Sequence, residues 1–223
     1  MALLDENMVN QLKEVFKRID KEIKIVNFVS ESNDKSKELQ SFLDEFKAVS
    51  DKIIIENIDY DSNKEKALEF GVEKLPALAF VDSNGIQTKG KFHGIPGGHE
   101  INSFVITILN TAGVGKEFDA STLERINSIN NRQKIKERIK EDVNLKVFVT
   151  LACHHCPDVV VATQMMAIKN ENISAEMIDI ALFPELAETY GVKSVPTVIY
   201  NNSEVTIGAK SVNEILNKIE TVI

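Results

Sequence analysis

The 223-residue sequence has no tryptophan, only two cysteines, and no apolar run near the roughly 18 residues that a bilayer-spanning helix needs. Residues 1–6 also lack the basic and then apolar pattern of a signal peptide. We therefore expect no membrane segment and a cytoplasmic protein. An excess of positive charge is absent too, since the formal net charge is -8. Nucleic acid is not expected as a partner, because proteins that bind it carry basic surfaces.

What is present is the balance of an ordinary globular chain, with 43% hydrophobic and 27% charged residues. The chain also repeats itself at a shift of 120 residues without a gap, which indicates a duplicated domain. The best match aligns residues 71–80 with 191–200, a Gly-Val-x-x-apolar-Pro turn that runs into an apolar strand. The same shift places Glu56 on Glu176 and Asp59 on Asp179.

Each half predicts a strand, a helix, a strand, a helix, the proline turn, a hairpin and a closing helix. The expected elements are 23–29, 36–46, 53–58, 64–70, 77–81, 88–92 and 101–109, then 146–149, 158–169, 173–178, 184–190, 197–200, 205–207 and 212–219. A helix is expected before each half, at 8–19 and 123–139. This order resembles the thioredoxin fold.

The predicted fold class is therefore α/β, with two tandem thioredoxin-like folds whose mixed central sheets are flanked by helices. Glycines and a shift to polar residues mark a junction near 113–119. We expect a first domain at 1–118 and a second at 119–223.

Cys153 and Cys156, in the run Cys-His-His-Cys, follow an expected strand and open an expected helix. Unpaired backbone N–H groups and the helix dipole favour a thiolate at such a position, so Cys153 is the expected nucleophile. Cys156, one turn further on and more buried, is expected to resolve the mixed disulfide. The partial positive charge of His154 and His155 should lower the pKa of Cys153, and both histidines are expected to contact substrate.

A zinc site is the alternative interpretation of the two cysteines. Four consecutive residues cannot all face one ion, so zinc would need two further ligands from elsewhere in the chain. The only histidines outside the motif are His93 and His99. We therefore favour redox chemistry and predict no bound metal.

Pro196, after Val195, stands where thioredoxin-like folds carry a proline that faces the cysteine pair. We expect this proline to be cis and the Val195–Pro196 edge to bind the backbone of a substrate. Pro76 repeats the turn in the first half, but Asn33 and Ser36 stand where the second half has its cysteines. The first domain is therefore predicted to be a redox-silent copy.

With residues 150–160 (Thr-Leu-Ala-Cys-His-His-Cys-Pro-Asp-Val-Val) in view, the sequence resembles the N-terminal domain of the flavoprotein component of alkyl hydroperoxide reductase. The related two-fold, glutaredoxin-like protein disulfide oxidoreductases share this architecture. The resemblance covers nearly the whole chain. It implies a carrier of electrons from an NAD(P)H-dependent flavoprotein to the disulfide of a peroxiredoxin. It also implies that Gly98-His99-Glu100 places the Glu100 carboxylate beside the thiol pair, although Glu100 could instead only stabilise the start of a helix.

The sequence departs from the larger members of that family because it stops at Ile223, before any flavin or nucleotide module. Gly113-Val114-Gly115 lacks the third glycine and the strand context of a dinucleotide-binding fingerprint. We therefore expect no flavin or nicotinamide cofactor, and a separate flavoprotein of the thioredoxin-reductase type as electron donor. The alternatives are a general protein disulfide reductase or isomerase and, third, a zinc-binding adaptor.

Overall fold

The structure is a computed structural model that describes residues 4–135 and 142–223. The first repeat consists of α1 (Glu6–Phe16), β1 (Ile23–Val29), α2 (Asp34–Lys47), β2 (Ile53–Asp59), α3 (Lys64–Glu69), β3 (Ala77–Val81), β4 (Gln87–His93) and α4 (Glu100–Thr111). The second consists of α5 (Ala120–Ile135), β5 (Val143–Val149), α6 (Cys156–Lys169), β6 (Ile173–Asp179), α7 (Pro184–Thr189), β7 (Thr197–Tyr200), β8 (Glu204–Ile207) and α8 (Val212–Val222). Both repeats thus have the predicted order, and the α/β thioredoxin-like fold is confirmed.

The two leading helices differ from their predicted ends. α1 stops at Phe16, and the backbone N–H of Ile19 then turns back to the Phe16 carbonyl, which buries Ile19 without a further helical turn. The helix expected at 123–139 begins earlier, at Ala120, after Asp119 accepts the backbone N–H of Thr122. Residues 136–139 of that prediction lie outside the described residues.

All eight strands form one continuous sheet, in the order β2-β1-β3-β4-β6-β5-β7-β8. The repeats join where β4 pairs in parallel with β6, with Gly90 opposite Ala175 and His93 opposite Ile178. This pairing removes an exposed edge from each repeat. A shared sheet was not predicted, and the boundary between domains 1–118 and 119–223 stays a prediction.

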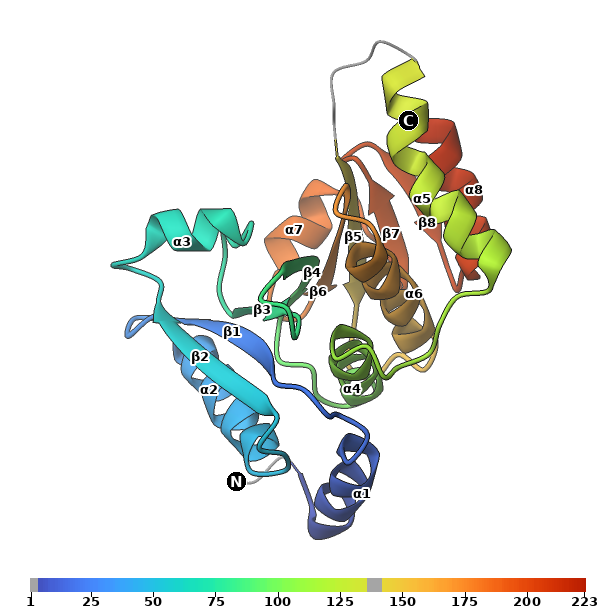
Figure 1. Cartoon of the computed structure of the whole chain (residues 1–223). Helices are drawn as coiled ribbons and strands as arrows, with labels where there is room; N and C mark the ends of the chain where they lie inside the picture. The colour runs from blue at the N-terminus through green and yellow to red at the C-terminus, as the bar shows by residue number, and fades with distance from the viewer. Residues whose placement is uncertain (1–3, 136–141) are drawn as a thin grey trace.

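Helices cover both faces of the sheet, as the alternation of strand side chains requires. Ile25 of β1 and Leu145 of β5 face the main core, which takes Phe104 of α4 and Met166 of α6. The opposite face carries two smaller clusters, one under α3 and one under α7. In Figure 1, α4 and α6 lie side by side on the main-core face, one from each repeat.

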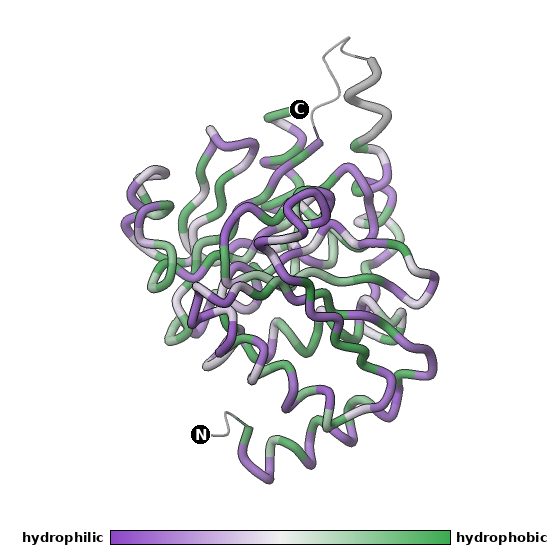
Figure 2. The backbone as a smooth tube through the Cα atoms, turned by 90° about the vertical axis from the view of Figure 1, so that its left-hand side faces the viewer, coloured by the Kyte–Doolittle hydropathy of each residue, from purple (hydrophilic) through white to green (hydrophobic). Residues whose placement is uncertain are grey.

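Apolar and polar stretches alternate along the chain in short segments (Figure 2). Among the described residues, no helix combines the length and the apolar character needed to span a membrane.

Candidate active site

Cys153 and Cys156 are joined by a disulfide at the start of α6. As predicted, the two sulfur-bearing residues differ in exposure: Cys153 is half-buried and Cys156 is fully buried. α6 begins at Cys156, two residues before the predicted start, because Pro157 has no N–H to leave unpaired and suits a first turn. The pair is therefore built with one sulfur that a partner can reach and one that it cannot.

The loop between β5 and α6 holds Cys153 in place. The backbone N–H of Cys153 donates to the Thr150 carbonyl at 3.0 Å. His154 and His155 are both exposed, and His155 occupies the N-cap position of α6 without a side-chain capping bond. The imidazoles thus stand beside the reachable sulfur, on the side open to a partner. Their effect on the Cys153 thiol, and their contact with substrate, remain predictions.

The Val195–Pro196 peptide bond is cis, as expected. Pro196 is buried and its carbonyl accepts the backbone N–H of Gly208 at 2.8 Å, while Val195 is half-buried. Within the described residues, the backbone of Val195 makes no hydrogen bond. Val195 and Cys153 also pack against the same core cluster. The arrangement leaves an open backbone edge that can pair with an extended segment of a substrate protein.

The first repeat has the same turn without the redox chemistry. Leu75–Pro76 is also cis. At the positions that match the cysteines, Asn33 caps α2 by accepting the backbone N–H of Ser36 at 2.8 Å, and Ser36 is fully buried. These two side chains stabilise the start of a helix, and neither can exchange a disulfide.

Glu100 is the first residue of α4 and is fully buried. One carboxylate oxygen, Oε2, accepts from the Ser103 hydroxyl. The other, Oε1, has no hydrogen-bond partner among the described residues. Burial raises the pKa of Glu100 to about 7, and the negative charge of Asp179 adds to the rise. A carboxyl group with this pKa can take up or release a proton near neutral pH, whereas a plain helix-end carboxylate stays charged.

Gly98 and His99, the two residues that precede Glu100 in the sequence, bring the first repeat into contact with the cysteine loop of the second repeat. The backbone N–H of His99 donates to the Leu151 carbonyl at 3.0 Å. Gly98 has φ +54, and a Cβ on it would lie 2.5 Å from the same carbonyl oxygen. Only glycine therefore allows this close approach. The contact places the N-terminus of α4, and with it Glu100, against the loop that carries Cys153.

Asp179, at the end of β6, was not singled out by the sequence as a functional residue. It is 2% exposed, and burial raises its pKa, although one oxygen accepts the backbone N–H of Ala181 at 3.0 Å. Its counterpart in the first repeat, Asp59, lies at the surface, where hydrogen bonds from Ser62 lower its pKa. The repeat register marks the position, but only the structure shows that the second copy is buried beside Glu100.

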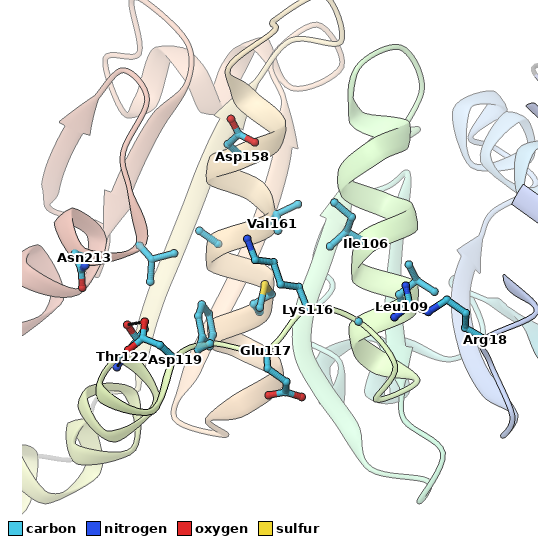
Figure 3. Close-up of a pocket in the computed structure, with 15 residues that line it drawn as sticks. Arg18, Ile106, Leu109, Lys116, Glu117, Asp119, Thr122, Asp158, Val161 and Asn213 are labelled. Atoms are coloured by element: carbon cyan, nitrogen blue, oxygen red, sulfur yellow. Dashed lines mark hydrogen bonds between the residues drawn. The ribbon is translucent and has the colours of Figure 1, made fainter. Parts of the chain in front are cut away.

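A cavity of about 840 Å³ runs between α4 and α6 and reaches Asp158, near the disulfide (Figure 3). Ile106 of α4 and Val161 of α6 line its walls, and Lys116 of the linker reaches into it. Neither cysteine lines this cavity. Over the described residues, no group of three or more His, Cys, Asp or Glu side chains is placed to hold a metal ion.

Comparison with known proteins finds a thioredoxin family model that matches each repeat. A family model described as Thioredoxin matches residues 5–107, and one described as Thioredoxin domain matches residues 143–220. The F subunit of the alkyl hydroperoxide reductase of Pseudomonas aeruginosa is 31% identical over 98% of this chain. The NADH dehydrogenase of Bacillus subtilis is 29% identical over 97% of this chain. The chain spans only 38% of the length of either relative.

Solved structures agree with these relatives. The NTD (N/C) domain of the alkyl hydroperoxide reductase AhpF of Enterococcus faecalis is 36% identical, with a TM-score of 0.88, and the match covers 97% of this chain and 99% of that one. A protein disulfide oxidoreductase from Aeropyrum pernix is 23% identical, covers 100% of this chain and 94% of its own, and has a TM-score of 0.86, which shows that it shares the fold.

Proposed function

Because the chain belongs to the family of the N-terminal, tandem thioredoxin-fold domain of the alkyl hydroperoxide reductase flavoprotein, we propose that it carries electron pairs to a peroxiredoxin or another protein disulfide. The donor in this proposal is a separate NAD(P)H-dependent flavoprotein reductase. The observation that carries the proposal is the asymmetric disulfide: Cys153 is within reach of a partner, Cys156 is fully buried, and Val195 offers a free backbone edge.

Reduction of the acceptor takes two exchanges. The Cys153 thiolate attacks one sulfur of the acceptor disulfide, forms a mixed disulfide and releases the other acceptor sulfur as a thiolate. The Cys156 thiolate then attacks the Cys153 sulfur and releases the second acceptor sulfur. Two electrons pass to the acceptor, which ends as a dithiol after taking up two protons, and the chain returns to the Cys153–Cys156 disulfide present in the structure.

The oxidised chain must be reduced again, since disulfide exchange alone creates no reducing power. A flavoprotein of the thioredoxin-reductase type supplies the two electrons through its own dithiol, by the same exchanges in reverse. Each partner must leave before the other can reach Cys153, so both contacts are small and short-lived.

Glu100 is proposed to assist proton transfer during resolution. The buried Cys156 thiol has to lose its proton before it can attack, and no solvent reaches it. A carboxylate that protonates near pH 7 can accept that proton and return it in the reducing half of the cycle. The unpaired Oε1 atom supports this role, because a capping carboxylate accepts a backbone N–H group, and neither oxygen of Glu100 does so among the described residues.

A general protein disulfide reductase or isomerase would use the same residues, so the two functions separate by substrate. The test uses the pre-reduced chain in single turnover with an oxidised peroxiredoxin and, separately, with insulin as an unrelated disulfide. Thiols gained by each acceptor are counted over time. The carrier function predicts much faster reduction of the peroxiredoxin, whereas equal rates would favour the general reductase. A zinc-binding adaptor would reduce neither acceptor.

A further inference from the structure

A second polar cavity, of about 510 Å³, lies on the sheet face that carries α3 and α7, opposite the main core. It sits over the seam between the repeats, where β4 pairs with β6. The turn after α3 and the helix α7 form its rim. Its floor is lined by Lys91, His93, Asn144, Lys146 and Glu176. None of them belongs to the cysteine motif.

Glu176 is the centre of a charged cluster at the floor of this cavity. Its carboxylate lies 3.7 Å from the Lys91 ammonium, 3.7 Å from the Lys146 ammonium and 3.5 Å from His93 Nε2. Asn144 donates to Oε1 at 2.9 Å. Burial raises the pKa of Glu176, but Lys91, His93, Lys146 and the Asn144 hydrogen bond together lower it below its ordinary value, so the carboxylate is charged. Burial lowers the pKa of His93 to about 4, so this imidazole is neutral.

The charges of the floor do not cancel. Two ammonium groups, of Lys91 and Lys146, face the one carboxylate of Glu176. The exposed fraction of the side chain is 9% for Lys91, 16% for Lys146 and 13% for Glu176. At the exposed rim, Lys74 pairs with Glu185 at 3.4 Å, and Glu73 is the other charged residue of the rim. The floor by itself therefore holds one more positive than negative charge, in a place with little access to solvent.

The hydrogen-bond donors at the floor of the cavity are also incompletely used. Lys146 donates to the side-chain oxygens of Asn144 and Asn202. Lys91 has three N–H donors, but within the described part of the chain its ammonium makes no hydrogen bond, only the 3.7 Å ion pair. His93, whose imidazole is also buried, lies beside the same carboxylate. Lys91 and His93 stand two residues apart on β4 and line the same cavity.

We propose that this cavity binds a phosphate-type oxyanion, held by the ammonium groups of Lys91 and Lys146. Its negative charge offsets the surplus positive charge of the floor, and its oxygens accept the unused Lys91 donors. The cavity is large enough for free phosphate or for the phosphate group of a small monoester.

The test measures binding to the full-length oxidised protein by isothermal titration calorimetry at pH 7, with ionic strength held constant by sodium chloride. Inorganic phosphate and glycerol 3-phosphate are the two probes. The expected result is saturable binding with a stoichiometry of one and a Kd in the millimolar range or tighter. Lys91→Met and Lys146→Met should each weaken binding by at least about tenfold. Lys193→Met, at an exposed turn outside the cavity, should leave it unchanged.

The two probes distinguish the source of the anion, because a site built for an ester binds glycerol 3-phosphate more tightly than inorganic phosphate. Should a methionine variant fail to fold, the wild-type His93 imidazole signals followed by NMR provide the second readout, since they must shift on saturation with phosphate. No saturable binding of either probe by the wild-type protein, no shift of His93, or undiminished binding by a folded Lys91→Met variant would overturn the proposal and leave the cluster as a connection between the repeats.

Discussion

The imidazole rings of His99 and His154 lie 4.0 Å apart between centroids, one from the silent repeat and one from the cysteine motif. Together with the bond from the His99 N–H to the Leu151 carbonyl, this contact fixes the start of α4 against the cysteine loop. The silent repeat therefore forms part of the wall around the disulfide. This arrangement gives a repeat without cysteines a structural part in the site.

The first prediction separates the roles of the two cysteines. Cys153→Ser should abolish disulfide reduction, because the remaining thiol is fully buried. Cys156→Ser should still attack but stop at a mixed disulfide with the acceptor, which non-reducing electrophoresis and mass spectrometry detect. The Cys153→Ser/Cys156→Ser double variant is the control and should trap nothing. Turnover by either single variant at the wild-type rate would contradict these roles.

The second prediction concerns the reactivity of Cys153. The start of α6 and the neighbouring His154 and His155 favour a thiolate, so the alkylation rate of the reduced protein should titrate with a midpoint below about 7.5. His154→Gln/His155→Gln should raise that midpoint. A wild-type midpoint near the free-thiol value of about 8.5 would show that neither the helix nor the histidines activate Cys153.

The third prediction uses the pH dependence of stability. The pKa of Glu100 is about 7 in the folded protein, above its ordinary value of 4.5. Between pH 4.5 and pH 7, Glu100 is therefore protonated in the folded state and ionised in the unfolded state. The contribution of Glu100 to the free energy of unfolding is therefore full below pH 4.5 and is lost as pH rises through 7. Glu100→Gln removes this loss. From pH 5 to pH 8, the wild type should lose about 2 kcal/mol more than the variant does.

Urea unfolding at the two pH values measures this difference. Glu124→Gln, at an exposed position of α5, is the matched control and should follow the wild type. If Glu100→Gln and the wild type lose the same stability between pH 5 and pH 8, then Glu100 is charged throughout and cannot hold a proton for Cys156.

The fourth prediction tests the contact between the repeats. Gly98→Ala places a Cβ 2.5 Å from the Leu151 carbonyl oxygen at a backbone with φ +54, so the cysteine loop must shift. Gly113→Ala has the same kind of backbone, with φ +75, but its Cβ meets nothing within 4 Å. Both should lose about 1 kcal/mol of stability from the left-handed backbone. Only Gly98→Ala should also slow disulfide exchange, which stopped-flow measurement of thiol formation detects. Equal exchange rates in the two variants would mean that the contact does not position the site.

Much of this account could be predicted from the sequence, because the repeat carries the pattern of each fold twice. The strand and helix order and the difference in exposure between Cys153 and Cys156 follow from local pattern and spacing, and the cis Pro196 follows from the resemblance to thioredoxin-like folds. The pairing of β4 with β6 could not be predicted, since hydrophobic alternation shows which face of a strand is buried but not which edges meet. The contact of His99 with His154 depends on that pairing.

The sequence also could not predict which polar residues are buried. Asp59 and Asp179 occupy equivalent places in the two repeats, yet one is exposed and the other is buried beside Glu100. Glu56 and Glu176 differ in degree, with side chains 39% and 13% exposed, because only Glu176 lies on a strand of the seam and meets Lys91. A repeat in the sequence predicts that equivalent residues have the same surroundings. The packing of the two copies against each other gives these residues different burial and different neighbours.

The proposed electron transfer is tested most directly by a reconstituted assay. A flavoprotein reductase of the thioredoxin-reductase type, this protein and a peroxiredoxin are combined with NADH or NADPH and peroxide. Continuous nucleotide oxidation is expected that requires all three proteins, rises with the concentration of this chain and stops with Cys153→Ser. Nucleotide oxidation at the same rate without this chain, or with the Cys153→Ser variant in its place, would contradict it.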